Sequence, residues 1–289
     1  MIKKKLIFII FPLFIFSCSA EKNFQQELQT LISAEQSFAA LSKKSGMREA
    51  FLTYLTEDAI VFRPRPENGH TAYKNSPTQP GMLQWKPVHS AISHDCDLGF
   101  NTGPWEWRPT GKEEKPTLFG HFVSLWRKDS EANWRVIFDA GVGYATPSPE
   151  HNIDTVFKEF PRAKPEPAIA SAIVNLEEKF SENIASIGYA EALKRFATEK
   201  TRFYHKQDFP VIGAEVLLET IAEDERNWFF DPIASDIATS NDLGYAYGYI
   251  SNAGKSEIYS YLHIYRKNAA NQWHLAVDLI NRIPQEKTD

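Results

Sequence analysis

Cysteine is almost absent from this chain, which has only Cys18 and Cys96 among its 289 residues. Two cysteines can form one bridge at most, so a disulfide framework is excluded as the source of stability. Cys96 stands beside a predicted strand, where a free cysteine packs as a small apolar residue. A buried apolar core must therefore hold the fold, and the 43% content of hydrophobic residues is ordinary for a soluble globular protein.

Several functional signatures are missing as well. The formal net charge is −5 with a pI near 5.9, and no basic cluster of the kind that neutralises phosphates is present, which disfavours nucleic acid as a partner. The sequence has no Gly-rich phosphate loop, nucleophile elbow, paired-carboxylate motif or metal-ligand spacing of histidines. We therefore expect neither a cofactor nor a metal ion.

The one long apolar run lies at the beginning of the chain, at residues 6–16 behind three lysines. It is too short to span a bilayer comfortably and fits a secretory signal. The run ends in Ile-Phe-Ser-Cys, which resembles a bacterial lipobox except that Phe16 is bulkier than usual. The resemblance implies that residues 1–17 are removed and that Cys18 is acylated, which would tether a periplasmic or surface-facing protein to the cell envelope. The alternative is an ordinary signal peptide with an incidental cysteine.

A seven-residue stretch occurs twice. Residues 97–103 are Asp-Leu-Gly-Phe-Asn-Thr-Gly, and residues 242–248 are Asp-Leu-Gly-Tyr-Ala-Tyr-Gly. Both copies are followed by an aromatic-Arg-Lys triplet and by a Trp with an Asp five residues later, and corresponding landmarks lie 139 to 145 residues apart. Two domains of about 130 residues can each bury a core. We therefore expect an internal duplication.

Hydrophobic periodicity predicts the same order of elements in both halves. In the first half, a helix from residue 24 to the stop at Gly46 precedes these elements: helix 47–55 and strands 56–62, 86–95, 98–107, 117–127 and 134–142. In the second half, a helix that stops at Gly188 precedes these: helix 189–197, strand 200–205, helix 213–223 and strands 229–239, 243–251, 257–267 and 273–280. Helices followed by a long antiparallel sheet give the α+β class.

A proline-rich segment separates the halves. Residues 144–167 contain five prolines, and proline at this density favours extended, semi-rigid chain. The expected division is a first domain at 18–145, a linker at 146–167 and a second domain at 168–284.

The pattern resembles the nuclear transport factor 2-like superfamily, in its SnoaL-like and ketosteroid-isomerase-like branch. The resemblance is carried by these stretches: 55–62, 97–99, 126–128 and 134–139, with 196–204, 242–244, 265–267 and 273–278 in the second half. It implies two tandem cone-shaped domains, each with a curved antiparallel sheet wrapped around N-terminal helices and an apolar pocket. Such domains pair sheet to sheet, and here the two copies can pair within one chain as an internal pseudo-dimer.

The isomerases of this family use a helix Tyr, an Asp base after the first strand and a protonated strand acid. On this sequence the three positions hold other residues in both copies: Phe38 and Phe180, Arg63 and His205, Ser124 and His263. Phe cannot donate a hydrogen bond and Arg stays protonated. Isomerase activity is therefore disfavoured.

Strand alternation places Tyr259, Tyr261 and Tyr265 on the same face as His263. His titrates near neutral pH, so His205 and His263 are the candidate catalytic residues, although aromatic faces are more often plain packing. The candidate ligand-binding residues are these: Arg63, Phe122, Ser124, Trp126, Asp139, Tyr259, Tyr261, Tyr265 and Asp278. Arg63 can also belong to an exposed loop, and Asp139 and Asp278 can cap strand ends.

Three functions remain open. The first is non-catalytic binding of a small apolar or aromatic molecule, or of a protein partner, by an envelope protein anchored to the membrane through Cys18. The second is a cofactor-free acid–base enzyme of the cyclase, isomerase or hydratase type, acting in the second pocket. The third is a structural module whose cavities are filled by its own aromatic side chains.

Overall fold

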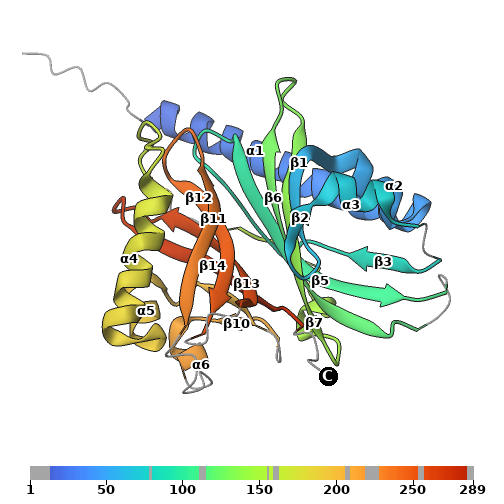
Figure 1. The fold of residues 1–289 in the computed structure, drawn as a ribbon. Coiled ribbons are helices and arrows are strands. Elements are labelled where there is room, and N and C mark those ends of the chain that lie inside the picture. Colours follow the sequence, from blue (N-terminus) through green and yellow to red (C-terminus); the bar gives the residue numbers. More distant parts are fainter. Residues whose placement is uncertain are drawn as a thin grey trace, which may run out of the picture.

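A computed structural model describes residues 14–77, 80–110, 115–154, 156–158, 163–205, 209–218, 228–252 and 257–284. These residues form two sheets with helices on the outer face of each, which gives four layers (Figure 1). The α+β class predicted from the sequence is confirmed. None of the described helices has the length and apolar character needed to cross a membrane.

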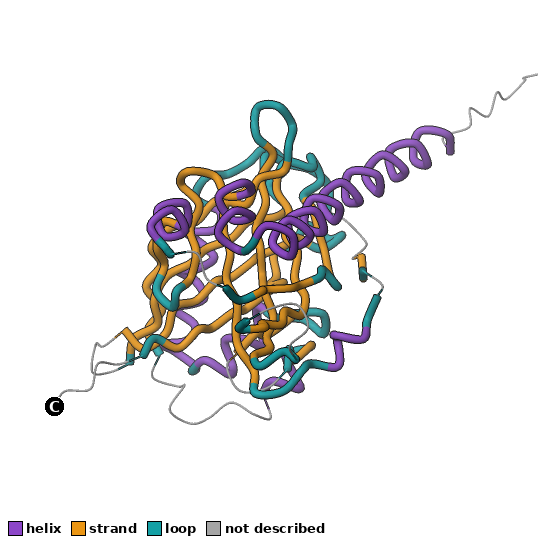
Figure 2. The backbone as a smooth tube through the Cα atoms, turned by 90° about the vertical axis from the view of Figure 1, so that its right-hand side faces the viewer, coloured by secondary structure: helices purple, strands orange, loops and turns teal. Residues whose placement is uncertain are grey.

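The first unit begins with the long helix α1 (Phe14–Ser45), whose N-terminal end extends beyond the strands (Figure 2). The remaining elements of this unit are α2 (Met47–Tyr54), β1 (Leu55–Phe62), β2 (Pro66–Asn68), α3 (Gly69–Asn75), β3 (Met82–Trp85), β4 (His89–Ile92), β5 (Leu98–Arg108), β6 (Leu118–Lys128) and β7 (Trp134–Tyr144). The described strands of this sheet run in the order β2-β1-β7-β6-β5-β4-β8, where β8 is Phe157–Lys158, and β3 also pairs with β5.

The second unit has the same order of principal elements. They are α4 (Ala172–Ile187), α5 (Tyr189–Phe196), β9 (Arg202–His205), β10 (Val211–Ile212), α6 (Ala214–Leu218), β11 (Phe229–Ile237), β12 (Leu243–Ser251), β13 (Glu257–Lys267) and β14 (Trp273–Arg282). The described strands run in the order β10-β9-β14-β13-β12-β11. In both units the first strand pairs in parallel with the last, and the long strands pair antiparallel.

The structure corrects the sequence-based elements in three places. Residues 63–85, where no element was predicted, contain β2, α3 and β3, and the strand expected at 86–95 is reduced to β4 at residues 89–92. The predicted linker contains a short 3-10 helix η1 (Pro149–Asn152) and a strand β8 (Phe157–Lys158) that pairs with β4. Short strands with few apolar residues leave a weak periodic signal, which explains why the sequence did not predict them. Part of the helix expected at 213–223 lies outside the described residues.

The glycines of the repeated motif bring backbone and helices close together. A β-carbon at Gly99 would lie 2.6 Å from a methyl group of Leu31 on α1, and one at Gly244 would lie 2.5 Å from Ile173 on α4. A β-carbon at Gly103 would lie 2.0 Å from the backbone carbonyl oxygen of Lys86, and one at Gly248 would lie 2.1 Å from that of Asp231. Any larger residue would push these segments apart, which agrees with the expected role of glycine at bent strands.

The two sheets pack face to face on an apolar core. Its buried residues come from the inner faces of both sheets, and include Phe100, Val123, Leu125, Phe138, Leu243, Leu262, Ile264, Val277 and Leu279. Two further cores lie between each sheet and its own helices. The two units therefore share one apolar interface between their sheets.

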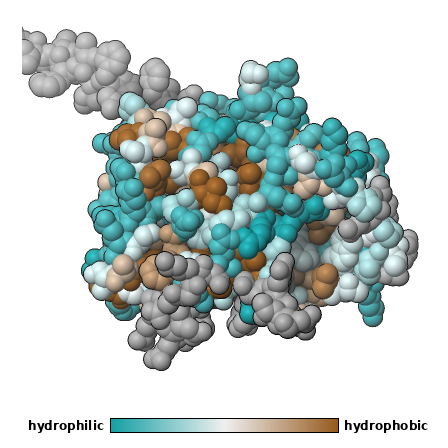
Figure 3. Space-filling model, in the orientation of Figure 1, coloured by the Kyte–Doolittle hydropathy of each residue, from teal (hydrophilic) through white to brown (hydrophobic). Residues whose placement is uncertain are grey.

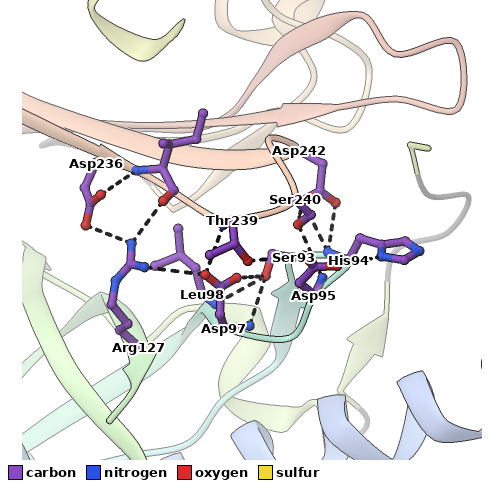
Figure 4. Close-up of polar contacts among 11 residues, drawn as sticks. Ser93, His94, Asp95, Asp97, Leu98, Arg127, Asp236, Thr239, Ser240 and Asp242 are labelled. Carbon is purple, nitrogen blue, oxygen red and sulfur yellow. Dashed lines mark hydrogen bonds and ion pairs between the residues drawn. The ribbon is translucent and has the colours of Figure 1, made fainter. Parts of the chain in front are cut away.

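Reciprocal hydrogen bonds at the repeated Asp residues join the units (Figure 4). The backbone N–H of Thr239 donates to the Asp97 carboxylate at 3.0 Å, and the N–H of His94 donates to the Asp242 carboxylate at 3.0 Å. Arg127 adds an ion pair to Asp236 at 2.8 Å. His94 and Thr239 lie at equivalent places in the two turns, so the contacts have approximate twofold symmetry. The repeated Asp therefore serves the contact between units.

The linker is fastened to both units through Glu150 in η1. Its carboxylate lies 2.9 Å from Nε2 of His121 on β6 and accepts a hydrogen bond of 2.7 Å from Arg202 on β9. Burial opposes ionisation of Glu150, but His121 and Arg202 outweigh it and lower the pKa of Glu150 to about 2. An ionised carboxylate shared by two buried side chains holds the linker against the seam between the sheets.

One edge of the second sheet exposes apolar side chains. Phe229 and Ile233 on β11 are 56% and 50% exposed. Figure 3 shows apolar surface mixed with polar surface on the face of the molecule that carries α4 and β11. Pro232 lies between these two residues and has no N–H to donate to another strand, which disfavours edge-to-edge pairing.

Candidate ligand-binding site

A buried carboxylate lies at the centre of the first unit. Glu35 on α1 is 0% exposed. Its neighbours on the same helix face, Ile32 and Phe38, are apolar core residues, so the carboxyl group lies within the core. One carboxylate oxygen accepts a hydrogen bond of 2.7 Å from the Trp85 indole. The other accepts three bonds, from Asn101 at 3.1 Å, Ser124 at 2.5 Å and the Trp126 indole at 2.8 Å.

Those four donors compensate in part for the burial of Glu35. Burial raises the pKa of Glu35 above its ordinary value, and the hydrogen bonds from Ser124, Trp85, Trp126 and Asn101 oppose the rise. The same bonds fix the orientation of both indoles. The carboxylate thus positions aromatic walls in the interior of the unit.

A cavity of about 280 Å³ lies beside this group. Residues from α2, α3 and five strands, with one residue that follows β1, line it: Met47, Phe51, Phe62, Arg63, Tyr73, Leu83, Trp85, Trp105, Phe122, Asp139, Ala140 and Gly141. Three residues predicted from the sequence, Arg63, Phe122 and Asp139, are among them. Ser124 and Trp126 lie behind the wall as partners of Glu35. The cavity is largely aromatic, with two ionisable groups.

Asp139 is the unpartnered polar group of this cavity. Among the described residues its carboxyl group makes no hydrogen bond and no ion pair within 4.0 Å. Burial and the nearby Glu35 raise the pKa of Asp139 well above its ordinary value, and Arg63 only partly opposes them. The raised pKa favours the protonated form of Asp139, whose O–H group can donate a hydrogen bond into the cavity.

Arg63 is held at the cavity without a close ion pair. Its guanidinium lies 4.4 Å from the centre of the Tyr73 ring, and its NH1 group donates to the Ser76 hydroxyl at 3.3 Å. The carboxylate of Glu67 lies 4.0 Å from Nε and is half exposed, so it neutralises little of the charge. Arg63 is exposed, follows the end of β1 and also lines the cavity, so it belongs both to a surface loop and to the cavity.

Two tryptophans lie directly opposite each other on neighbouring strands of the cavity wall. Trp85 on β3 pairs with Trp105 on β5. The Trp105 ring lies over Gly120 and Gly141, where added β-carbons would come within 2.4 Å and 3.3 Å of the indole. The absence of side chains at these glycines makes room for the ring to lie close against β6 and β7.

The second unit holds the same pair of acids with different partners. Glu177 on α4 and Asp278 on β14 correspond to Glu35 and Asp139. Nδ1 of His263 lies 2.8 Å from Glu177, and the Tyr261 hydroxyl donates to the same carboxylate at 2.9 Å. The Tyr265 hydroxyl lies 3.4 Å from Nδ1 of His263. The acid that meets a Ser hydroxyl in the first unit thus meets an imidazole here.

Asp278 connects the two candidate catalytic histidines. It accepts a hydrogen bond of 2.8 Å from the Tyr189 hydroxyl, and its two oxygens lie 3.3 Å from Nε2 of His205 and 3.6 Å from Nε2 of His263. Burial alone would lower the pKa of His263, but the carboxylates of Glu177 and Asp278 outweigh burial and raise it. Likewise His205, His263 and Tyr189 outweigh burial and lower the pKa of Asp278.

Most of this second cluster is closed to solvent. Tyr261, His263, Tyr265 and Asp278 are 0% exposed and lie among the core side chains, whereas the His205 side chain is 21% exposed. Tyr259 is partly buried against Trp228. The structure brings His205 and His263 together as predicted, but the phenols expected to line a pocket are packed core residues. Catalysis by the two histidines stays a prediction.

Sequence reasoning missed Glu35 and Glu177. Each occupies a position of the helical stripe that apolar residues otherwise fill, three residues before Phe38 or Phe180, and the two lie 142 residues apart. A charge repeated within an apolar stripe is the signal that could have revealed them. Among the described residues, no group of three His, Cys, Asp or Glu side chains is arranged to hold a metal ion.

Comparison with solved structures finds similar folds over less than half of the chain. A ketosteroid isomerase-like protein from Erwinia carotovora atroseptica is 15% identical over 42% of this chain and 98% of its own, with a TM-score of 0.32. A nuclear transport factor 2-like superfamily protein from Salmonella enterica is 14% identical over 45% and 99%, with a TM-score of 0.33. An NTF2-like protein from Cytophaga hutchinsonii is 14% identical over 39% and 94%, with a TM-score of 0.30.

No protein-family model matches the sequence. No curated protein matches it either. The chain is therefore similar to proteins of this superfamily in structure comparison alone.

Proposed function

We propose that the first unit binds a small apolar or aromatic molecule in the cavity beside Asp139, without catalysis. The observation that carries the proposal is an aromatic cavity of about 280 Å³ that contains an unpartnered acid and an Arg without a close ion pair. Ligand sites in proteins are typically apolar clefts with a few polar groups that fix orientation. The corresponding acid in the second unit already contacts Tyr189, His205 and His263. Binding is thus assigned to the first unit.

We also infer that both units are cones of the nuclear transport factor 2 type that arose by duplication. Equivalent residues support this inference: Glu35 and Glu177 on the first helices, Asp139 and Asp278 on the last strands, and the reciprocal contacts of Asp97 and Asp242. The buried acids persist in both units, while their partners differ. Such divergence agrees with a binding role in one unit and a structural role in the other.

Filling the cavity should abolish binding. Leu83 lines the cavity and is partly exposed, so Leu83→Trp is expected to place an indole in the space with little loss of stability. A thermal-shift screen of one- and two-ring aromatic compounds should raise the Tm of the unmodified protein and leave that of Leu83→Trp unchanged. Leu118→Trp, at a residue that is 54% exposed on β6, is the matched control and should retain the shift. Equal shifts in all three proteins would contradict binding in the cavity.

The proposed location is the cell envelope, with Cys18 as the acylated anchor. The support is the sequence pattern at residues 6–18, because residues 1–13 lie outside the described residues and the side chain of Cys18 is not described. Cys18→Ala should release the protein from the membrane fraction and prevent incorporation of labelled palmitate. Labelling that persists in this variant would refute the lipid anchor.

A further inference from the structure

We propose that the ligand of the first unit is a flat aromatic carboxylate of one or two rings, whose carboxylate is held between Arg63 and Asp139. This inference rests on the proposed binding function and narrows it to one chemical class. Three features support it: the size of the cavity, the shape of its walls and the chemistry of its polar groups.

The size of the cavity suits one or two rings. An apolar cavity of roughly 150 Å³ binds a benzene ring in another protein. The cavity here has about 280 Å³, which accommodates a fused pair of rings or a single ring with a short substituent. A larger fused-ring skeleton would need the walls to move.

The shape of the walls favours a planar ligand. Trp85 is fixed by its hydrogen bond to Glu35, and the Trp105 ring is packed closely against two glycines. Phe51 stacks on Tyr73 with ring centres 4.1 Å apart, and this stacking fixes the positions of both rings in the wall. Flat, rigid aromatic surfaces contact another ring over a large area at low entropic cost.

The polar groups of the cavity match a carboxylate. Arg63 carries a guanidinium whose fork of N–H groups fits two carboxylate oxygens. Asp139 supplies an O–H donor that the fold leaves unused. A protonated acid that donates to a carboxylate makes a short charge-assisted hydrogen bond. Both groups would gain a partner from the same ligand atoms.

Other ligand classes leave one of these groups unsatisfied. A cationic ligand would meet the uncompensated charge of Arg63. A neutral hydrocarbon would leave the Asp139 carboxyl group and the remaining N–H groups of Arg63 without partners after water is displaced, which costs free energy. Glu35 cannot take either role in the cavity, because four donors already occupy its oxygens. A single negative charge on a flat ring satisfies the whole site.

The test compares 2-naphthoate with naphthalene-2-carboxamide, a neutral compound of the same shape, by calorimetry on the full chain. Naphthoate is expected to bind at least about tenfold more tightly than the carboxamide. Arg63→Leu should abolish that preference, whereas Arg65→Leu, two residues away and outside the cavity lining, should retain it. Asp139→Asn keeps an N–H donor and should retain most of the binding, and Asp139→Leu should weaken it about tenfold.

The outcomes separate the ligand class from the binding function. If the carboxamide binds as tightly as naphthoate, or if Arg63→Leu keeps the preference, the carboxylate assignment is overturned while binding in the cavity stands. Both proposals are refuted by a combination of two results. Neither compound binds, and every Tm shift found in the aromatic screen persists in the Leu83→Trp protein. Circular dichroism of each variant shows whether lost binding results from lost folding.

Discussion

Replacing Glu35 with leucine should lower the free energy of unfolding by about 3 kcal/mol. The Trp126 indole keeps a second acceptor in the Ser124 hydroxyl at 2.8 Å. The other donors, from Trp85, Asn101 and Ser124, would face an apolar side chain in a dry core. Each orphaned donor costs about 1–3 kcal/mol, and relief of the burial cost of the carboxyl group offsets part of the sum.

Urea unfolding of the Glu35 variants measures this effect. Glu35→Gln should lower the free energy of unfolding by less, about 1–2 kcal/mol. Its amide oxygen still accepts hydrogen bonds, whereas its NH₂ group faces a donor that it cannot accept from. Glu27→Gln is the matched control on the same helix, where the carboxylate pairs with Lys128 at the surface and contributes less than about 1 kcal/mol. A Glu35→Leu protein as stable as the Glu27→Gln protein would show that the buried carboxylate does not organise the first unit.

Replacing His263 with glutamine should destabilise the second unit by about 3 kcal/mol at slightly acidic pH. The imidazole lies between two buried carboxylates, Glu177 at 2.8 Å and Asp278 at 3.6 Å. Without a positive charge there, two acids face each other in a closed core. His205 and the hydroxyls of Tyr189, Tyr261 and Tyr265 also face this cluster, but only His205 can supply a second positive charge.

The sign of the pH dependence follows from the raised pKa of His263. A histidine whose pKa is higher in the folded state contributes its full stability below its unfolded value of about 6.5 and loses it as pH rises through the folded value. The difference in Tm between the unmodified protein and His263→Gln should therefore be largest near pH 5–6 and shrink above about pH 7. Below about pH 4 the stability falls again, because Asp278, whose pKa is lowered in the folded state, begins to lose its ionised form.

Thermal unfolding across this pH range is the measurement. His70→Gln is the control, since His70 is a partly buried histidine on α3, remote in sequence from the cluster. Its difference from the unmodified protein should stay small and nearly constant with pH. If the His263→Gln difference grew with rising pH, the imidazole would be stabilising the fold in its neutral form.

Much of the fold follows from local sequence. Helices that stop at Gly46 and Gly188 repeat a clear apolar period, and long strands such as β6 and β13 are mostly apolar or aromatic because they are buried on both faces. The repeated motif is visible in the sequence because each copy supplies an Asp, Asp97 or Asp242, to the contact between the units. Short elements such as β2, α3 and β8 lack this periodic signal and depend on the longer strands beside them.

The sequence by itself determined the α+β class, the repeated order of elements and the presence of Arg63, Asp139, His205 and His263 as polar residues on strands or directly after them. The tertiary structure alone decided which of them face an open space. His205 and His263 close on Asp278, whereas Arg63 and Asp139 stay apart across a cavity. The reason is physical: burial, hydrogen-bond partners and cavity volume depend on residues far apart in the chain, such as Glu35 with Trp126, and local patterns do not record these contacts.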